Sequence, residues 1–188
     1  MLDQNMSLLA YALLGLLHQQ DRSGYDLRKI FSTTPLTSFS DSPGSIYPAL
    51  QRLEQRGFIR SRVEERSGLR RRRLFHLTTT GLSELRRWQS QPVRDGALMR
   101  GVDDLMLRFG FMDESLGPAH SLNFLKSLKQ ALDAYIPTLR VYLEKHRADM
   151  PLSGGLALES GITGYESLLR WARCAIATYK KQMRGRKS

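Results

Sequence analysis

Residues 42–80 read SPGSIYPALQRLEQRGFIRSRVEERSGLRRRRLFHLTTT, and their pattern predicts a short helix followed by a β-hairpin. The helix is expected from Ser45 to Arg56. The hairpin would pair residues 58–64 with residues 72–77 across a polar tip that carries four consecutive arginines, Arg70 to Arg73. A helix that fits a groove, with a basic hairpin beside it, is the outline of a winged helix-turn-helix.

Apolar residues fall on one side of the predicted helix, at Ile46, Ala49, Leu50 and Leu53. The opposite side carries a set of larger and polar side chains, namely Tyr47, Pro48, Gln51, Arg52 and Gln55. With a helix start near Ser45, Pro48 would lie in the first turn, where a missing N–H costs no intrahelical bond. Gly57 is expected just after the helix, at the C′ position.

Positive charge is concentrated in the same region. The chain of 188 residues has a formal net charge of +11, and residues 52–76 hold nine arginines and three glutamates, a net charge of +6. This density indicates a polyanionic partner, and we expect double-stranded DNA. A membrane surface would require these arginines on an amphipathic helix, and Gly57, Gly68 and the β-like flanks argue against one.

Three more helices are expected around this segment. They cover residues 7–20, capped by Ser7, residues 25–31, capped by Ser23, and a stretch through Ser90 that follows a capping threonine. The first helix is apolar on most sides, so we expect it to pack both on its own domain and on another subunit. It is too short to span a bilayer and lacks a basic flank, so we expect a cytoplasmic protein without a membrane partner.

The C-terminal half predicts two long helices, from Pro118 to about Ala148 and from Leu156 to Gln182, with Pro137 kinking or interrupting the first. Both carry apolar residues at heptad spacing, which indicates helix pairing and a second copy of the chain. The resulting domains are residues 1–91, which bind DNA, residues 92–183, which dimerise, and a disordered basic tail, 184–188. The dimerisation residues would be Leu9, Leu13, Leu125, Leu128, Leu132, Tyr135, Leu139, Leu158, Ile162, Tyr165, Leu169 and Ile176.

Enzymatic chemistry finds no support in the sequence. The four histidines are far apart, and no phosphate loop, paired-carboxylate signature or nucleophile motif is present. We therefore expect no enzyme activity, no metal site and no cofactor. The single cysteine, Cys174, lies in an apolar helical pattern and is expected to be buried.

The motifs around the helix and hairpin together resemble a known family. Gly44 to Leu50, Leu53-Glu54, Gly57 to Ile59 and Leu77-Thr78 with Gly81 are similar to the GxxYPxLxxLExxGxI…LTxxG signature of the PadR-family transcriptional regulators. Residues 23–27 resemble that family's second-helix entry. Residues 94–111 and 166–179 are similar to the helical C-terminal domain of its longer, virulence-activator-like members. The hairpin departs from the family pattern, because it has Leu74-Phe75 where members usually carry tyrosine.

This resemblance implies a mainly α fold with a small β-hairpin: an N-terminal winged helix-turn-helix and a C-terminal antiparallel helical dimerisation domain. It implies a homodimeric repressor that binds an inverted-repeat operator and is associated with the nucleoid through this DNA binding. The candidate DNA-contacting residues are Tyr25, Ser45, Tyr47, Gln51, Arg52, Gln55, Arg70, Arg71, Arg72 and Arg73. Glutamine side chains can hydrogen-bond adenine and arginine side chains can hydrogen-bond guanine. The arginines of the hairpin, which is the wing of the winged helix, would contact phosphates.

Members of this family often release DNA when a small molecule binds near the dimer interface. Aromatic residues near the expected junction of the domains make a small aromatic effector a candidate partner; they are Trp88, Phe109, Phe111 and Trp171. Ordinary core packing is the alternative for each of them. A winged-helix protein-interaction module and a ligand-independent activator are the alternative functions, although a wing this basic favours DNA.

Overall fold

The computed structural model describes residues 6–39, 42–66, 69–93, 96, 98 and 101–185. The chain divides into two compact units, one formed by Met1–Gln91 with Met106–Leu116 and the other by Pro92–Leu105 with Gly117–Ser188. The fold is mainly α-helical with a small antiparallel sheet, as predicted. Among the described residues, no helix is both long enough and apolar enough to cross a bilayer.

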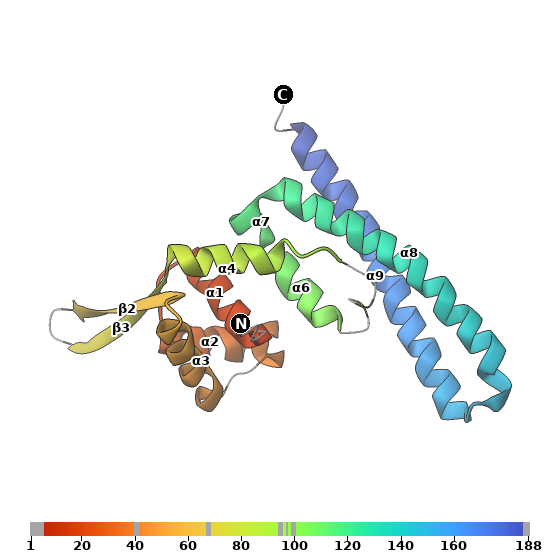
Figure 1. The fold of residues 1–188 in the computed structure, drawn as a ribbon, viewed down its shortest axis with the longest axis horizontal. Helices are drawn as coiled ribbons and strands as arrows, with labels where there is room; N and C mark the ends of the chain where they lie inside the picture. The colour runs from red at the N-terminus through yellow and green to blue at the C-terminus, as the bar shows by residue number, and fades with distance from the viewer. Residues whose placement is uncertain are drawn as a thin grey trace. The chain divides into compact units, whose positions relative to one another are not determined.

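The first unit is a set of helices with a three-stranded sheet at one side (Figure 1). Its elements in chain order are α1 (Leu8–Gln19), β1 (Arg22–Ser23), α2 (Gly24–Thr33), a 3-10 turn (Pro35–Ser38), α3 (Pro43–Gln55), β2 (Ile59–Arg66), β3 (Leu69–Leu77) and α4 (Thr79–Gln89). The capping predictions are confirmed. Ser7, Ser23 and Thr78 accept hydrogen bonds from backbone N–H groups in the first turns of α1, α2 and α4.

Helix α3 begins two residues earlier than predicted. Ser42 caps it through a hydrogen bond from the Gly44 N–H of 3.2 Å, and Pro43 occupies the first helical position. Pro48 therefore lies inside the helix rather than in its first turn. The prediction was wrong because Ser42-Pro43 and Ser45 are both plausible starts, and the sequence does not rank two competing caps.

The end of α3 follows a Schellman motif. The Phe58 N–H donates to the Leu53 carbonyl at 3.0 Å, and the Gly57 N–H donates to the Glu54 carbonyl at 2.9 Å. Gly57 has a φ of 72°, which confirms its predicted place at C′. This turn sets the angle at which the chain leaves α3 and enters β2.

The sheet has the strand order β1-β3-β2, with both pairs antiparallel. The hairpin strands β2 and β3 pair from Ile59 with Leu77 toward a tip beyond Arg66 and Leu69. Strand β1 lies between the first two predicted helices, and it pairs Arg22 with Phe75 and Ser23 with Leu74. Beyond Leu74 the wing is therefore a two-stranded ribbon.

One apolar core joins the helices of the first unit to the base of the wing. Leu13, Leu27, Ile46, Ile59 and Leu85 all have no exposed surface. Tyr11 of α1 stacks on Trp88 of α4 with ring centroids 4.2 Å apart, and it donates a hydrogen bond of 2.9 Å to Glu84. Burial together with this bond raises the pKa of Tyr11 far above its ordinary value.

Residues 106–116 pack with the first unit, although the sequence suggested that they belong to the second domain. They include the end of α6 (Val102–Gly110) and the whole of α7 (Met112–Leu116), which was not predicted. The guanidinium of Arg108 is buried and donates to the backbone carbonyls of Gln89 and Gln91. A buried guanidinium needs such acceptors, so this contact holds α6 at the end of α4.

The second unit is built on an antiparallel pair of long helices, α8 (Pro118–His146) and α9 (Leu152–Gly185), joined by a 3-10 turn at Arg147–Asp149 (Figure 1). Helix α8 continues through Pro137, so the predicted interruption is absent from it. Helix α9 starts four residues earlier than predicted and runs into the expected basic tail. Residues 186–188 of that tail lie outside the described residues.

Ion pairs align the two long helices. Asp133 and Arg140 on α8, and Arg147 in the 3-10 turn that follows it, pair with Arg173, Glu166 and Glu159 on α9. Each step of seven residues forward along α8 and the turn is therefore a step of seven residues backward along α9. The buried apolar residues of α8 do not follow the heptad spacing along the whole helix. After Leu132 the buried positions are Ile136 and Leu143, and Tyr142 is 51% exposed. A helix of 3.6 residues per turn drifts away from a repeat of 3.5.

Cys174 is exposed on α9, so the prediction of a buried thiol was wrong. It lies between Arg173 and Ala175 on the outer side of the helix, while Ala172 and Ile176 take the buried positions. The local sequence is apolar on several sides, and only the partner helix decides which side is covered.

Candidate DNA-binding surface

The outer face of α3 presents the side chains that the helical pattern predicted. Ile46, Ala49, Leu50 and Leu53 are at most 2% exposed, so they fix the rotation of the helix on the core. The opposite side leaves five residues exposed, and the last three of them carry polar or charged side chains: Tyr47, Pro48, Gln51, Arg52 and Gln55. Ser45 is partly buried at the start of this face.

The ring of Tyr47 lies against Gly24, the first residue of α2. A Cβ atom added at Gly24 would lie 2.5 Å from the Tyr47 ring, so only glycine allows this approach. The ring is nevertheless 48% exposed, and the neighbouring Tyr25 is 61% exposed. Both phenol groups are therefore presented at the junction of α2 and α3.

A hollow of about 580 Å³ brings residues from three elements together. Tyr25 of α2, Tyr47 of α3, and Arg72 and Arg73 of β3 line it. Four of the predicted DNA-contacting residues thus share one concave surface. Gln51, Arg52 and Gln55 follow on the exposed side of α3, and Arg52 and Gln55 also line a groove of about 420 Å³ beside the start of α1.

Arg73 is bound by the last turn of α3. Its guanidinium contacts the Glu54 carboxylate at 2.6 Å and donates from Nε to the Ser61 hydroxyl at 2.8 Å. Ser61 in turn donates to the other Glu54 oxygen at 2.6 Å, which closes a ring of three side chains. The Arg73 guanidinium also lies 5.2 Å from the centre of the Phe75 ring.

Arg72 is bound by the start of α2. It forms an ion pair with Asp26 and donates to the Ser23 hydroxyl at 3.2 Å. Asp26 also accepts from the Ser23 backbone N–H at 3.1 Å, which makes Ser23 and Asp26 the two halves of a capping box. The same carboxylate thus caps a helix and holds the wing.

Both carboxylates have a lowered pKa. Hydrogen bonding from Ser61 is the main cause at Glu54, and Arg73 adds to it against the effect of partial burial. At Asp26, partial burial raises the pKa, but hydrogen bonds from Ser23 and the charge of Arg72 outweigh it. Both groups are therefore ionised at neutral pH, where the ion pairs are complete.

Acidification should weaken the fold of this unit. The folded-state pKa of each carboxyl lies below its ordinary value, 3.8 for Asp26 and 4.5 for Glu54, so the stabilisation is present above about pH 5 and is lost as the pH falls through the folded-state values. The measurement is the urea midpoint between about pH 7 and pH 3. The double variant Asp26→Asn, Glu54→Gln should lose less stability on acidification, and an unchanged pH profile would contradict this assignment.

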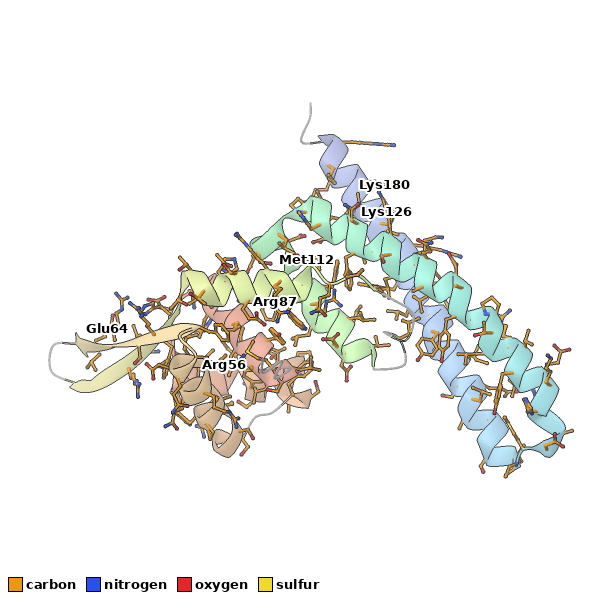
Figure 2. All side chains as sticks on the ribbon, in the orientation of Figure 1. Arg56, Glu64, Arg87, Met112, Lys126 and Lys180 are labelled. Atoms are coloured by element: carbon orange, nitrogen blue, oxygen red, sulfur yellow. The ribbon has the colours of Figure 1, made fainter. Side chains whose placement is uncertain are left out.

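The other two arginines of the predicted run of four are described only in part. Arg70 and Arg71 belong to β3, but their side chains lie outside the described part of the structure. Two further arginines near the surface were not singled out in the sequence. Arg28 lies 5.6 Å from the centre of the Tyr25 ring, and Arg56 lies 4.9 Å from that of Phe58 (Figure 2 labels Arg56). Arg28 lies on α2, and Arg56 directly follows α3 as its C-cap residue.

Comparison with known proteins decides the family. The model of the transcriptional regulator PadR-like family matches residues 13–87. The negative transcriptional regulator PadR of Bacillus subtilis is 30% identical over 142 residues, which cover 74% of this chain and 75% of that protein. The chain belongs to the PadR-like family of transcriptional regulators. It is therefore a regulator and not an enzyme.

Solved structures of the Bacillus subtilis protein are also similar. Its complex with operator DNA is 25% identical, covers 94% of this chain and 99% of its own, and has a TM-score of 0.42. Its complex with p-coumaric acid is 24% identical, with coverage of 95% and 99% and a TM-score of 0.40. The family assignment rests on the sequence matches alone.

The PadR signature residues have structural roles that the geometry explains. Glu54 holds the wing through Arg73 and Ser61. The Thr78 hydroxyl caps α4 and also donates to the Gly57 carbonyl at 2.7 Å, which joins the start of α4 to the end of α3. Gly81 lies against the Phe58 carbonyl oxygen, with no room for a side chain between them.

The predicted dimerisation residues are largely covered within one chain. Those already buried are Leu13, Leu125, Leu128, Leu132, Ile162 and Ile176. The others are partly covered, namely Leu9, Tyr135, Leu139, Leu158, Tyr165 and Leu169. The edge of the Tyr135 ring faces Tyr165, with centroids 5.4 Å apart, so the heptad pattern mainly records the pairing of α8 with α9.

The predicted effector residues have different environments. Trp88 and Phe111 are buried in the first unit, where Trp88 stacks on Tyr11 and the Phe111 ring lies against Gly15. Phe109 is partly buried in the same unit. Trp171 lies on α9 of the second unit and is 39% exposed. Two of the four therefore have a packing role in the core.

Proposed function

We propose that this PadR-family regulator binds double-stranded DNA by sequence and does so as a homodimer. The observation that carries the proposal is the polar outer face of α3, because its rotation is fixed by four buried residues and it leaves Gln51, Arg52 and Gln55 free to meet base edges. Ser45 would add a contact at the start of the helix.

Phosphate contacts would come from the elements on either side of that face. Tyr25 and Tyr47 present their phenol groups beside the reading helix, and hydroxyl groups commonly bind phosphate oxygens. Arg70 and Arg71 near the wing tip would supply charge that is independent of sequence. These contacts orient the reading helix, while the α3 side chains select the bases.

A second copy of the chain would complete the second unit. Its outer surface keeps large apolar side chains exposed, including Val141, Tyr142, Leu152 and Leu156. Apolar side chains clustered near the α8–α9 turn favour burial against a partner. A dimer with twofold symmetry would present two α3 helices to a DNA site with inverted-repeat symmetry.

Repression is the regulatory outcome that the relatives support. The Bacillus subtilis relative is a negative transcriptional regulator. A dimer seated on its operator excludes other proteins from that stretch of DNA, so binding alone suffices to repress. The present protein would act in the cytoplasm, at the nucleoid.

Footprinting tests the dimeric arrangement. We expect the wild-type protein to protect two half-sites related by a twofold axis, with centres about one helical turn apart or a multiple of it. Sedimentation of the same complex should give two chains per duplex. A single asymmetric protected segment, or one chain per duplex, would contradict the proposal.

A small aromatic ligand is a candidate effector of the second unit. Trp171 keeps part of its ring accessible on α9, and aromatic ligands favour such surfaces. The Bacillus subtilis PadR has been solved with p-coumaric acid. We expect p-coumaric acid to quench the tryptophan fluorescence of the wild type and to quench that of Trp171→Phe less. Equal quenching of both proteins would remove Trp171 from the site.

A further inference from the structure

Arg72 and Arg73 of β3 lie where the sheet changes from three strands to two. Strand β1 pairs with β3 at Phe75 and Leu74 and goes no further. Arg73 and Arg72 are the next residues toward the tip, paired only with Val63 and Glu64 of β2. An isolated two-stranded ribbon has little stability of its own, so its direction depends on what holds its base.

Each of these arginines is bound to a different helix. Arg73 and Arg72 both line the hollow described above, yet their guanidinium groups reach different helices. Arg73 reaches Glu54 at 2.6 Å near the end of α3, and Arg72 reaches Asp26 at the start of α2. The base of the wing is thus bound to both helices of the helix-turn-helix.

The ion pairs belong to networks with defined geometry. Glu54, Ser61 and Arg73 form a closed ring in which all three contacts are between 2.6 and 2.8 Å. Asp26 is fixed independently by two hydrogen bonds from Ser23, of 2.9 and 3.1 Å. Isolated surface ion pairs contribute little to stability, whereas networks with fixed partners hold side chains in one geometry.

We propose that Asp26 and Glu54 are positioning residues: they hold the wing at a fixed angle to α2 and α3 through Arg72 and Arg73, and they keep these two guanidinium groups away from phosphates. The inference rests on the proposed DNA binding for its functional consequence. Other basic residues would then make the charge contacts with DNA. Arg72 and Arg73 would instead fix the orientation of the wing.

Hydrogen exchange tests the positioning role without DNA. In Glu54→Gln and in Asp26→Asn, amides of residues 59–77 should exchange about fivefold faster than in the wild type, because the wing opens more often. The urea midpoint of global unfolding should fall only slightly, by the modest contribution of each partly exposed ion pair. Asp21→Asn is the matched control, since Asp21 pairs with Arg62 of β2 at 3.1 Å but lies on neither helix. Unchanged exchange in both variants would overturn the proposal.

DNA binding supplies the second measurement. The probes are a duplex that the wild type enriches from a random pool and a shuffled duplex of the same composition. Glu54→Gln and Arg73→Gln should each weaken binding to the enriched duplex by about fivefold to tenfold, and the double variant should lose little more than either one. The dependence of log affinity on log salt should keep its wild-type slope in Arg73→Gln.

The opposite assignment has a distinct signature. If Arg73 binds a phosphate, Arg73→Gln lowers the salt slope by about 0.9, and Glu54→Gln tightens binding because it frees a cation. That pair of results would overturn the positioning role. A wild-type protein that enriches no duplex would instead remove the proposed function, and hydrogen exchange would still decide whether the two carboxylates hold the wing.

Discussion

Replacing Gly81 by alanine should lower the free energy of unfolding by about 3 kcal/mol, at the upper end of the usual cost of overpacking. An added Cβ would lie 2.0 Å from the Phe58 carbonyl oxygen and 2.8 Å from a methyl carbon of Leu77. The closest neighbour is backbone, and that carbonyl also accepts the Thr78 N–H at 3.0 Å. Relief would require α4 to move away from the α3–β2 turn.

Gly161→Ala is the matched control for this substitution. Gly161 lies inside α9, and nothing lies within 4 Å of the position of its Cβ. Alanine there should raise stability by about 0.5–1 kcal/mol, because it reduces the freedom of the unfolded chain. Urea unfolding of both variants gives the comparison. A Gly81→Ala protein as stable as the wild type would contradict the close packing of α4 on Phe58.

The double variant Gln51→Ala, Arg52→Ala should lower the affinity for the enriched duplex by at least about thirtyfold. Each side chain would lose a base contact worth about 1–3 kcal/mol. Both side chains are exposed, so the fold should be unaffected. Affinity for the shuffled duplex should fall much less, because the nonspecific contacts remain.

Lys126→Ala provides the control for lost charge, since Lys126 is exposed on α8 of the second unit (Figure 2). It removes one positive charge, as Arg52→Ala does, and should change the affinity for both duplexes only slightly. Fluorescence anisotropy at one salt concentration measures the affinity of each of the two variants for each of the two duplexes. An equal loss on the enriched and shuffled duplexes in the double variant would show that α3 does not read bases.

Much of the fold could be predicted from local patterns. The inward face of α3 follows from the spacing of Ile46, Ala49, Leu50 and Leu53, because helical periodicity leaves few alternatives. The caps at Ser7, Ser23 and Thr78 are equally local. The start of α3 was the exception, since Pro43 and Pro48 both suit a first turn and only the packed helix distinguishes them.

What the sequence could not show are contacts between distant residues. The pairing of β1 with β3 joins residues about fifty positions apart, and two residues are too few to form a recognisable strand. The partners of Arg72 and Arg73 lie on α2 and α3, so four consecutive arginines looked equivalent until Asp26 and Glu54 were placed beside two of them. The departure of the buried residues of α8 from heptad spacing depends in the same way on the contact of α8 with α9.

We propose that the exposed face of α3 reads DNA sequence for a dimer. Selection of duplexes from a random pool by the purified full chain provides the decisive test. We predict enrichment of one inverted repeat, together with loss of that enrichment in the Gln51→Ala, Arg52→Ala variant. Recovery of unrelated sequences by the wild type, with no shared repeat, would contradict the claim.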